Sequence, residues 1–405
     1  MLDNKPQSLQ FPDNFLWGCS TSAHQIEGGL VNDWSEWEKS PSRLQELKDK
    51  QLDSLDFISG AAANSYENNN ADIDCLKRLG ANVYRFSLDW SRIEPAPGEF
   101  DEAVLEYYRN LAIKLKAKGI EPFITLWHWP LPLWVRDRGG WENKETAVLF
   151  QNFVLKTVAY LDKEVNYWIT LNEPMVYASQ SYIAGEWPPQ KKSRLLAWRV
   201  INNLATGHLL AYVAIKKINS LNQVGLAKNN MFFEASGGKL INKFLTIIGN
   251  WWWNFRFLDK VVRELDFIGL NYYFHNLVDK GFGRPHIYEK KSDLGWGLHP
   301  EGIYETLVGL NRYKKPIYVT ENGLADKDDR HREWYITEIV RNMHRAISEG
   351  VDVRGYMHWS LIDNFEWAYG FQPRFGLYEI NYRTYERIAR PSAYFYANIC
   401  RRNGI

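Results

Sequence analysis

The sequence is poor in cysteine and almost free of net charge. Its three cysteines, Cys19, Cys75 and Cys400, are too few for a disulfide framework and lack the spacing of a zinc site. The 49 basic and 48 acidic residues leave a net charge of +1, so no overall field draws the chain to nucleic acid or to an anionic membrane. We therefore expect a small or neutral partner, without nucleic acid or membrane.

Long apolar runs are also missing. Residues 1–10 are polar and lack the apolar stretch of a signal peptide, which favours the cytoplasm. The longest aromatic and apolar tract, residues 244–258, contains Asn250, Asn254 and Arg256 and is too short to span a bilayer. There is also no linker of Pro, Gly or Ser, so we expect residues 1–405 to form a single domain.

Aromatic residues, by contrast, are abundant. They make up 15% of the chain, with 18 Trp and 23 Tyr. Aromatic faces stack on the C–H faces of sugar rings, and Tyr and Trp also offer hydrogen-bond donors. Most such side chains are nevertheless buried in the core of a protein. The excess is a hint of carbohydrate binding and does not by itself define a site.

Short β-type segments alternate with longer helical segments along the whole chain. Strands are expected near residues 15–20, 83–89, 121–127, 167–172, 224–229, 266–272, 317–321 and 354–359. Helices are expected at residues 102–118, with Asp101 as N-cap, and at residues 144–161, 194–219 and 332–349. This alternation predicts an α/β protein, a single (β/α)8 TIM barrel.

Polar and aromatic residues gather at the expected strand ends, where barrel enzymes assemble their active sites. Strands 1 to 8 place there Gln25, Arg85, His128, Trp129, Asn172, Glu173, Asn271, Tyr273, Glu321 and Trp359, followed by Asp363, Asn364, Glu366 and Trp367. Chance would not put so many such groups at the ends of strands. We therefore expect them to surround one site.

Two of these residues, Glu173 and Glu321, end strands 4 and 7. A retaining glycosidase needs one ionised carboxylate as nucleophile and one protonated carboxyl as general acid. A nearby guanidinium such as that of Arg85 favours the anion, whereas a drier setting favours the protonated acid. Either glutamate alone would be an ordinary loop residue. The pair, in the segments 172–174 and 321–323, predicts glycosidase chemistry.

Other candidates keep a structural alternative. His128 could be a core histidine, Asn271 and Tyr273 could only pack at a strand end, and Trp296 could anchor a loop. Asp363 and Glu366 could suggest a divalent metal, but no further oxygen ligands cluster near them. The segment 236–239 lacks the spacing of a phosphate-binding loop. We expect neither a metal nor a cofactor.

Several motifs, in order along nearly the whole chain, resemble family 1 of the glycoside hydrolases, the β-glucosidase and β-galactosidase family. They are the segments 15–18 and 25–28, 84–87 and 90–93, the pair His128 and Trp129, Asn172-Glu173-Pro174, and 320–323. The resemblance implies a (β/α)8 barrel whose members hydrolyse β-glycosides without a cofactor.

The resemblance also implies roles for individual residues. Glu173 would be the acid/base, and Glu321 the nucleophile, with Arg85 held against it. Asn271 and Tyr273 would support the nucleophile and the sugar 2-hydroxyl, which Asn172 would also contact. The remaining positions would bind the sugar, with Trp359 as a stacking floor and Trp296 at the aglycone entrance: Gln25, His128, Trp129, Trp296, Trp359, Glu366 and Trp367.

These roles predict a retaining, exo-acting β-glycosidase that works through a covalent glycosyl-enzyme intermediate. Glu366 would repel a phosphorylated sugar, so an unphosphorylated β-glycoside or oligosaccharide is expected, with β-glucose first and β-galactose or β-fucose as further glycones. Net sugar transfer uses the same residues. A sugar-binding protein on the same fold is the other class, but it is disfavoured because both glutamates are present.

One segment departs from the family pattern. Residues 225–266, between strands 5 and 6, form a shorter connection than is usual in the family and carry Trp251, Trp252 and Trp253. This predicts a more open and mobile rim, partly plugged by the three tryptophans. The alternative is that they pack as the core of a shortened helix. The aglycone, the glucose to galactose preference and the oligomeric state stay open.

Overall fold

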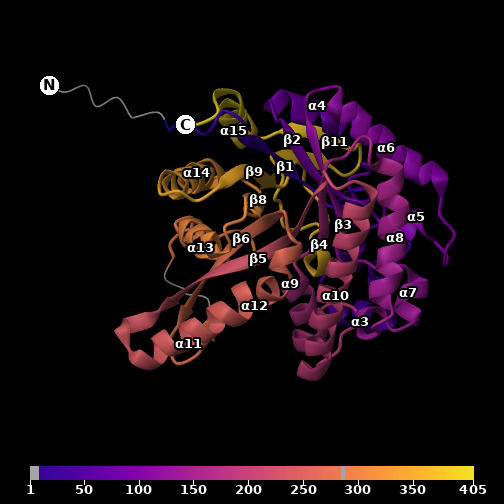
Figure 1. Cartoon of the computed structure of the whole chain (residues 1–405), viewed down its shortest axis with the longest axis horizontal. Helices are drawn as coiled ribbons and strands as arrows, with labels where there is room; N and C mark the ends of the chain where they lie inside the picture. The colour runs from indigo at the N-terminus through magenta and orange to yellow at the C-terminus, as the bar shows by residue number, and fades with distance from the viewer. Residues whose placement is uncertain (1–8, 284–287) are drawn as a thin grey trace.

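The computed structural model describes residues 9–283 and 288–405, and its centre is a closed barrel of eight parallel strands (Figure 1). Parallel pairing runs from β5 through β4, β3, β2, β1, β9 and β8 to β6, and β6 pairs back to β5. The strands are β1 (Leu16–Ser20), β2 (Val83–Ser87), β3 (Glu121–Trp127), β4 (Tyr167–Asn172), β5 (Gln223–Ala235), β6 (Phe267–Val278), β8 (Ile317–Asn322) and β9 (Val353–Trp359). The expected TIM barrel is confirmed.

Helices connect successive strands and surround the barrel (Figure 1). The main ones are α4 (Asn69–Leu79), α6 (Glu102–Lys116), α8 (Thr146–Leu161), α10 (Arg194–Ile218), α11 (Leu240–Asn250), α12 (Arg256–Val261), α13 (Gly302–Leu310), α14 (Arg332–Ser348) and α15 (Pro391–Arg402). Shorter helices lie in the loops: α1 (Ala23–Ile26), α2 (Asp33–Trp37), α3 (Pro41–Asp49), α5 (Trp90–Ile93), α7 (Leu133–Asp137) and α9 (Pro174–Ser179). An antiparallel pair, β10 (Tyr378–Asn381) and β11 (Glu386–Ala389), follows the barrel, and β7 (Phe282–Gly283) pairs antiparallel with the end of β6.

The four helices expected from the sequence are all present, with ends within two residues of the expected ones. The Asp101 side chain accepts hydrogen bonds from the backbone N–H groups of Ala103 and Val104, as an N-cap does. Among the described residues, no helix is both long and apolar enough to cross a bilayer.

The interior of the barrel changes character from one end of the strands to the other. Near the strand starts, it is filled by an apolar layer made of Val83, Phe123, Ile169, Ala227, Phe267, Tyr318 and Met357. Two residues after Val83 on β2, Arg85 points to the same side, because side chains alternate along a strand. It is fully buried, as are Thr125 and Thr320. The packed layer therefore supports a polar layer at the strand ends.

Strands β5 and β6 are longer than expected. Their ends at Ala235 and Val278 lie six residues beyond the expected ends (235 minus 229, 278 minus 272), and the two strands stay paired over this extension. Helix α11 packs against β5, and together they form an arm that projects from the barrel at the lower left of Figure 1. Extended pairing, rather than an open gap, forms the rim at this point.

The three tryptophans of the shortened segment have different surroundings. Trp251 and Trp252 are 48% and 38% exposed, so the core alternative is wrong for both. Trp253 turns inward, and its indole N–H donates to the Asn229 side-chain oxygen at 3.3 Å. The partial plug is therefore Trp253 alone, and the mobility of the rim stays a prediction.

Candidate active site

Glu321 lies near the end of β8 and is tied to a buried guanidinium. Arg85 donates to Glu321 Oε1 at 2.5 Å, and the Tyr273 hydroxyl donates to Oε2 at 3.0 Å. Burial raises the pKa of Glu321, while Arg85 and the Tyr273 hydroxyl act against that rise by stabilising the anion. Both carboxylate oxygens are thus held in place, with a full positive charge beside one of them.

Glu173 follows β4 directly, and no arginine or lysine in the described part of the chain forms a hydrogen bond or ion pair with its carboxyl. Its Oε1 accepts hydrogen bonds from the side-chain amides of Asn271 at 2.8 Å and Asn229 at 3.2 Å. Burial first, and then the charge of Glu321, raise the pKa of Glu173 to about 8. The carboxyl is therefore protonated at neutral pH and can donate a proton. The two glutamates have the contrast in environment that acid and nucleophile require.

A chain of hydrogen bonds defines the protonation of His128. The Asn172 side-chain oxygen accepts from Arg85 at 2.8 Å, which leaves its amide nitrogen to donate to His128 Nε2 at 2.9 Å. Burial and the charge of Arg85 lower the pKa of His128 well below its usual range, so the ring is neutral. Its proton is then on Nδ1, which has no partner among the described residues and can donate to a ligand.

The loop after β9 brings Glu366 to the opposite wall. Gln25 donates to Glu366 Oε2 at 3.2 Å and to the Asn364 side-chain oxygen at 3.0 Å, which connects this loop to the segment after β1. Burial, together with the charges of Glu321 and Glu173, raises the pKa of Glu366 to about 8. Glu366 thus shares one pocket with Glu173 and Glu321.

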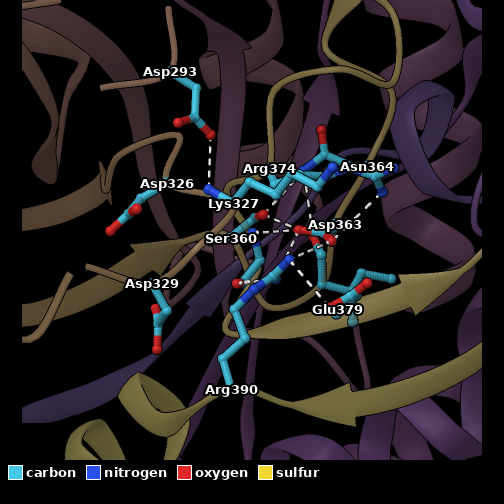
Figure 2. Close-up of polar contacts among 12 residues, drawn as sticks. Asp293, Asp326, Lys327, Asp329, Ser360, Asp363, Asn364, Arg374, Glu379 and Arg390 are labelled. Carbon is cyan, nitrogen blue, oxygen red and sulfur yellow. Dashed lines mark hydrogen bonds and ion pairs between the residues drawn. The ribbon is translucent and has the colours of Figure 1, made fainter. Parts of the chain in front are cut away.

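Asp363, once considered as a metal ligand, has a structural role (Figure 2). Its carboxylate is fully buried and accepts two hydrogen bonds from Arg390, at 3.0 and 2.9 Å, with Arg374 at 3.5 Å. Figure 2 also shows Asn364 next to it, bonded to the Ser360 hydroxyl at 2.9 Å. This ion pair anchors the loop that carries Glu366. In the described parts of the chain, no three metal-binding side chains come together.

Aromatic rings form the walls of the pocket. Trp129 packs on Trp367, with ring centroids 4.6 Å apart, and its indole N–H donates to the Asn172 carbonyl at 3.0 Å. Trp359 is stacked beside His128, 6.1 Å between centroids. Trp296 meets the edge of Phe274 at 4.6 Å, on another part of the wall. Flat apolar surfaces alternate with hydrogen-bonding groups, an arrangement suited to a sugar ring.

The structure brings together all the residues to which the family resemblance gave catalytic or sugar-binding roles, whereas Asp363 and Asn364, also expected around the site, do not line the cavity. Those that line one cavity are Gln25, His128, Trp129, Glu173, Tyr273, Trp296, Glu321, Trp359, Glu366 and Trp367. The other three, Arg85, Asn172 and Asn271, lie beneath it and bond to its lining. None of the described residues that line this cavity is a lysine or an arginine.

Several neighbours were missed at the sequence level. Asn229 contacts Glu173, and Glu186 and Trp187 line the cavity from the loop after α9; Trp253, expected only as part of the rim plug, contacts Asn229 and lines the cavity too. Asn229 could have been found, because it stands at the expected end of strand 5. The others lie on the extended arm or in a loop, where no strand-end rule applies.

A (β/α)8 barrel with two buried strand-end glutamates, one beside a guanidinium and one protonated, is the arrangement expected of a glycoside hydrolase. The sequence model "Glycosyl hydrolase family 1" matches residues 7–263 and 255–405, and the chain belongs to this family. The two matches meet between β5 and β6, where the connection is short. The chain is therefore a glycoside hydrolase of family 1.

Relatives cover nearly the full length of the chain. The 1,4-beta-D-glucan glucohydrolase of Thermotoga neapolitana is 31% identical over 98% of this chain and 99% of its own, and the beta-galactosidase of Pyrococcus woesei is 31% identical over 98% of each. The beta-glycosidase from Pyrococcus horikoshii superposes with a TM-score of 0.90 at 36% identity, covering 98% of this chain and 96% of its own. The beta-glucosidase from Thermotoga maritima in complex with deoxynojirimycin gives 0.88 at 30% identity, covering 98% and 99%.

Proposed function

We propose that the protein is a retaining, exo-acting β-glycosidase that acts on unphosphorylated β-glycosides, with β-glucose as its main glycone and β-galactose or β-fucose as others. The observation that carries the proposal is the unequal pair: Glu321 beside a guanidinium, Glu173 protonated and held by amides. The relatives include both a glucan glucohydrolase and a beta-galactosidase, which supports glucose and galactose as glycones.

In the first step, Glu321 attacks the anomeric carbon of the bound sugar. A bond forms between its carboxylate oxygen and that carbon, the glycosidic C–O bond breaks, and Glu173 passes its proton to the leaving oxygen. Tyr273 and Arg85 hold the attacking carboxylate in position before the bond forms. The aglycone leaves as a neutral alcohol.

In the second step, Glu173 is ionised and acts as a base. The charge of Glu321 has been used in the covalent bond, so the repulsion that raises the pKa of Glu173 is gone and the anion is less costly. Glu173 takes a proton from water, the water oxygen bonds to the anomeric carbon, and Glu321 leaves as carboxylate. If an alcohol replaces water, the outcome is sugar transfer.

The charge of the cavity supports a neutral substrate. Glu173, Glu186, Glu321 and Glu366 are among its lining residues, whereas no lysine or arginine is found among those described. A sugar phosphate would bring two negative charges towards these carboxyls without a cation to pair with them. Neutral hydroxyl groups can instead bond to Gln25, Glu366 and the free N–H of His128.

Two further parts of the proposal concern the whole chain. We propose that residues 1–405 work as one catalytic domain, since the backbone of Leu9 pairs with that of Ile405 across the outside of the barrel. We also propose a cytoplasmic location, which the free state of Cys19, Cys75 and Cys400 supports.

The test is hydrolysis of 4-nitrophenyl β-glucoside and β-galactoside by the purified protein. Proton NMR of the first sugar released should show the β-anomer, the mark of retention. Glu321→Gln should lower kcat at least about a thousandfold on every substrate, because the nucleophile is lost. Glu173→Gln should affect alkyl glycosides, which need the acid, more than nitrophenyl glycosides.

Glu121→Gln is the matched control, because Glu121 begins β3 at the opposite end of the barrel. It should keep the activity of the wild type. Release of the α-anomer first would refute retention. Sugar binding without turnover by the folded wild type would favour the sugar-binding alternative.

A further inference from the structure

The arm formed by β5, β6 and α11 carries a large apolar surface. We call it the α11 face and define it by seven side chains that are 38 to 84% exposed: Leu240, Ile241, Phe244, Ile247, Ile248, Trp251 and Trp252. Single exposed apolar residues are common, but a contiguous set of this size usually marks an interaction site. Helix α11, which carries most of this face, projects from the barrel (Figure 1).

An ordinary surface helix buries its apolar side, whereas helix α11 exposes it. Its buried side consists of Asn242 and Gly249, and its apolar side chains point outwards. Asn242 donates to the Ser236 carbonyl and to the Asp279 carboxylate, at 2.8 and 3.2 Å. At Gly249, a Cβ atom would lie 2.4 Å from the ring of Phe282, so a larger residue there would displace that ring. Specific contacts thus hold the helix with its apolar side facing out.

Every charged residue of the segment that forms the face is basic, while the carboxylate of Asp279, just after the neighbouring strand β6, lies 4.0 Å from the Lys239 ammonium. Between Glu234 and Asp259 the sequence contains Lys239, Lys243 and Arg256 and no acidic residue. Arg256 lies over the Trp252 ring, 4.1 Å from its centroid. Apolar side chains with tryptophans beside lysines and arginines are typical of helices that lie in the headgroup region of a bilayer. The charge is complementary to anionic lipids.

A second copy of the chain is a poorer match for this surface. A two-fold interface would place the same patch against itself, and Lys243 would then face a surface whose nearby acid, Asp279, already pairs with Lys239. We propose that the α11 face binds the surface of an anionic lipid bilayer, with its apolar side chains inserted below the headgroups. The net charge of only +1 led us to expect no membrane partner. The proposal departs from that expectation because the charged residues of the segment 235–258 on this arm are all basic.

The experiment is sedimentation of the full-length protein with vesicles of phosphatidylcholine, with and without phosphatidylserine. Wild-type protein should sediment with the anionic vesicles and dissociate as salt rises. Each lysine near an anionic surface strengthens binding about fivefold, which corresponds to about 1 kcal/mol. The double variant Lys239→Gln with Lys243→Gln should therefore bind the vesicles about 30-fold more weakly. Phe244→Ser with Ile247→Ser should reduce it at least about tenfold, because inserted apolar area is lost.

The matched control is Leu195→Ser with Val213→Ser on α10, two exposed apolar residues away from the face. This variant should bind as the wild type does, and all variants should keep glycosidase activity because the changes lie outside the site. Absence of wild-type binding, or an equal loss in the control, overturns the proposal. A wild-type dimer that the Phe244 and Ile247 changes dissociate, without vesicle binding, would instead show a second copy as the occupant.

Discussion

Lys228 provides the sharpest prediction, because it is a buried cation that donates to no carboxylate among the described residues. It lies on β5, fully buried, and its ammonium donates to the Asn229 carbonyl at 2.5 Å. The Trp253 ring centroid is 5.4 Å from its nitrogen. Burial lowers the pKa of Lys228 from 10.5 to about 7, and the charge of Glu173 opposes that fall. We predict that Lys228→Met stabilises the protein at low pH.

The magnitude follows from the pKa difference between the folded and unfolded chain. One unit of pKa difference corresponds to about 1.4 kcal/mol. The fall in the pKa of Lys228 from 10.5 to about 7 therefore means that, below pH 7, the charged lysine lowers the free energy of unfolding by about 5 kcal/mol relative to a neutral side chain. The lost contact with Asn229 costs about 1 kcal/mol, so the net gain is about 4 kcal/mol at pH 6.

The sign of the pH dependence is fixed by which state binds the proton. Below pH 7 both states are protonated and the whole penalty acts on the wild type. Between pH 7 and 10.5 the folded lysine is neutral while the unfolded one is still charged, so the penalty falls as pH rises. At pH 9 it is about 2 kcal/mol, and the advantage of Lys228→Met should shrink by about 3 kcal/mol between pH 6 and pH 9.

The assay is urea unfolding of wild type and Lys228→Met at pH 6 and pH 9, with thermal unfolding in parallel. With an unfolding entropy of about 2.1 cal/mol/K per residue, a gain of about 4 kcal/mol raises Tm by about 5 °C. Lys114→Met, at an exposed lysine, is the control and should shift neither value. An advantage that is equal at both pH values, or a variant less stable than wild type at pH 6, would refute the reasoning.

Three further predictions test the same pocket. Glu173→Gln should gain stability as pH rises, because the folded pKa of about 8 lies above the unfolded 4.5: urea unfolding should show no advantage at pH 4.5 and about 5 kcal/mol above pH 8. Arg85→Met should lower kcat/KM about a hundredfold to a thousandfold and move the acid limb of the pH profile upward, because Glu321 loses its cation. Asp363→Asn should cost about 3 to 5 kcal/mol in urea unfolding and raise KM, since Arg390 loses its partner and the Glu366 loop its anchor.

The strand-end residues were predictable because two simple rules combine. Alternating β and α segments predict a barrel, and a barrel gathers the strand ends at one mouth. Glu173 and Glu321 belong to segments far apart in the sequence, yet the rule places both in the same pocket, as the structure does. Their opposite environments were also foreseeable in part, since Arg85 was expected beside Glu321.

The arm could not be foreseen from local sequence. Asn229 and Asn230 stand where β5 was expected to stop, because asparagine is depleted in strands. The strand continues because β6 runs beside it and pairs up to Ala235 and Val278. A tertiary partner thus overrides the local preference. The exposure of Trp251 was unpredictable for a similar reason. Local sequence favours burial of an apolar residue, but α11 exposes its apolar side, so Trp251 at its end faces outwards.

The two catalytic candidates are physically connected, although they lie on different strands. Arg85 bonds to Glu321 and to the Asn172 oxygen, and the Asn271 amide bonds to that same oxygen at 3.2 Å and to Glu173 at 2.8 Å. One fixed chain of donors and acceptors therefore sets the distance and orientation between nucleophile and acid. Because every member is buried and paired, a change at Asn172 should disturb both carboxyl groups at once, whereas a change at Tyr273 should reach only Glu321.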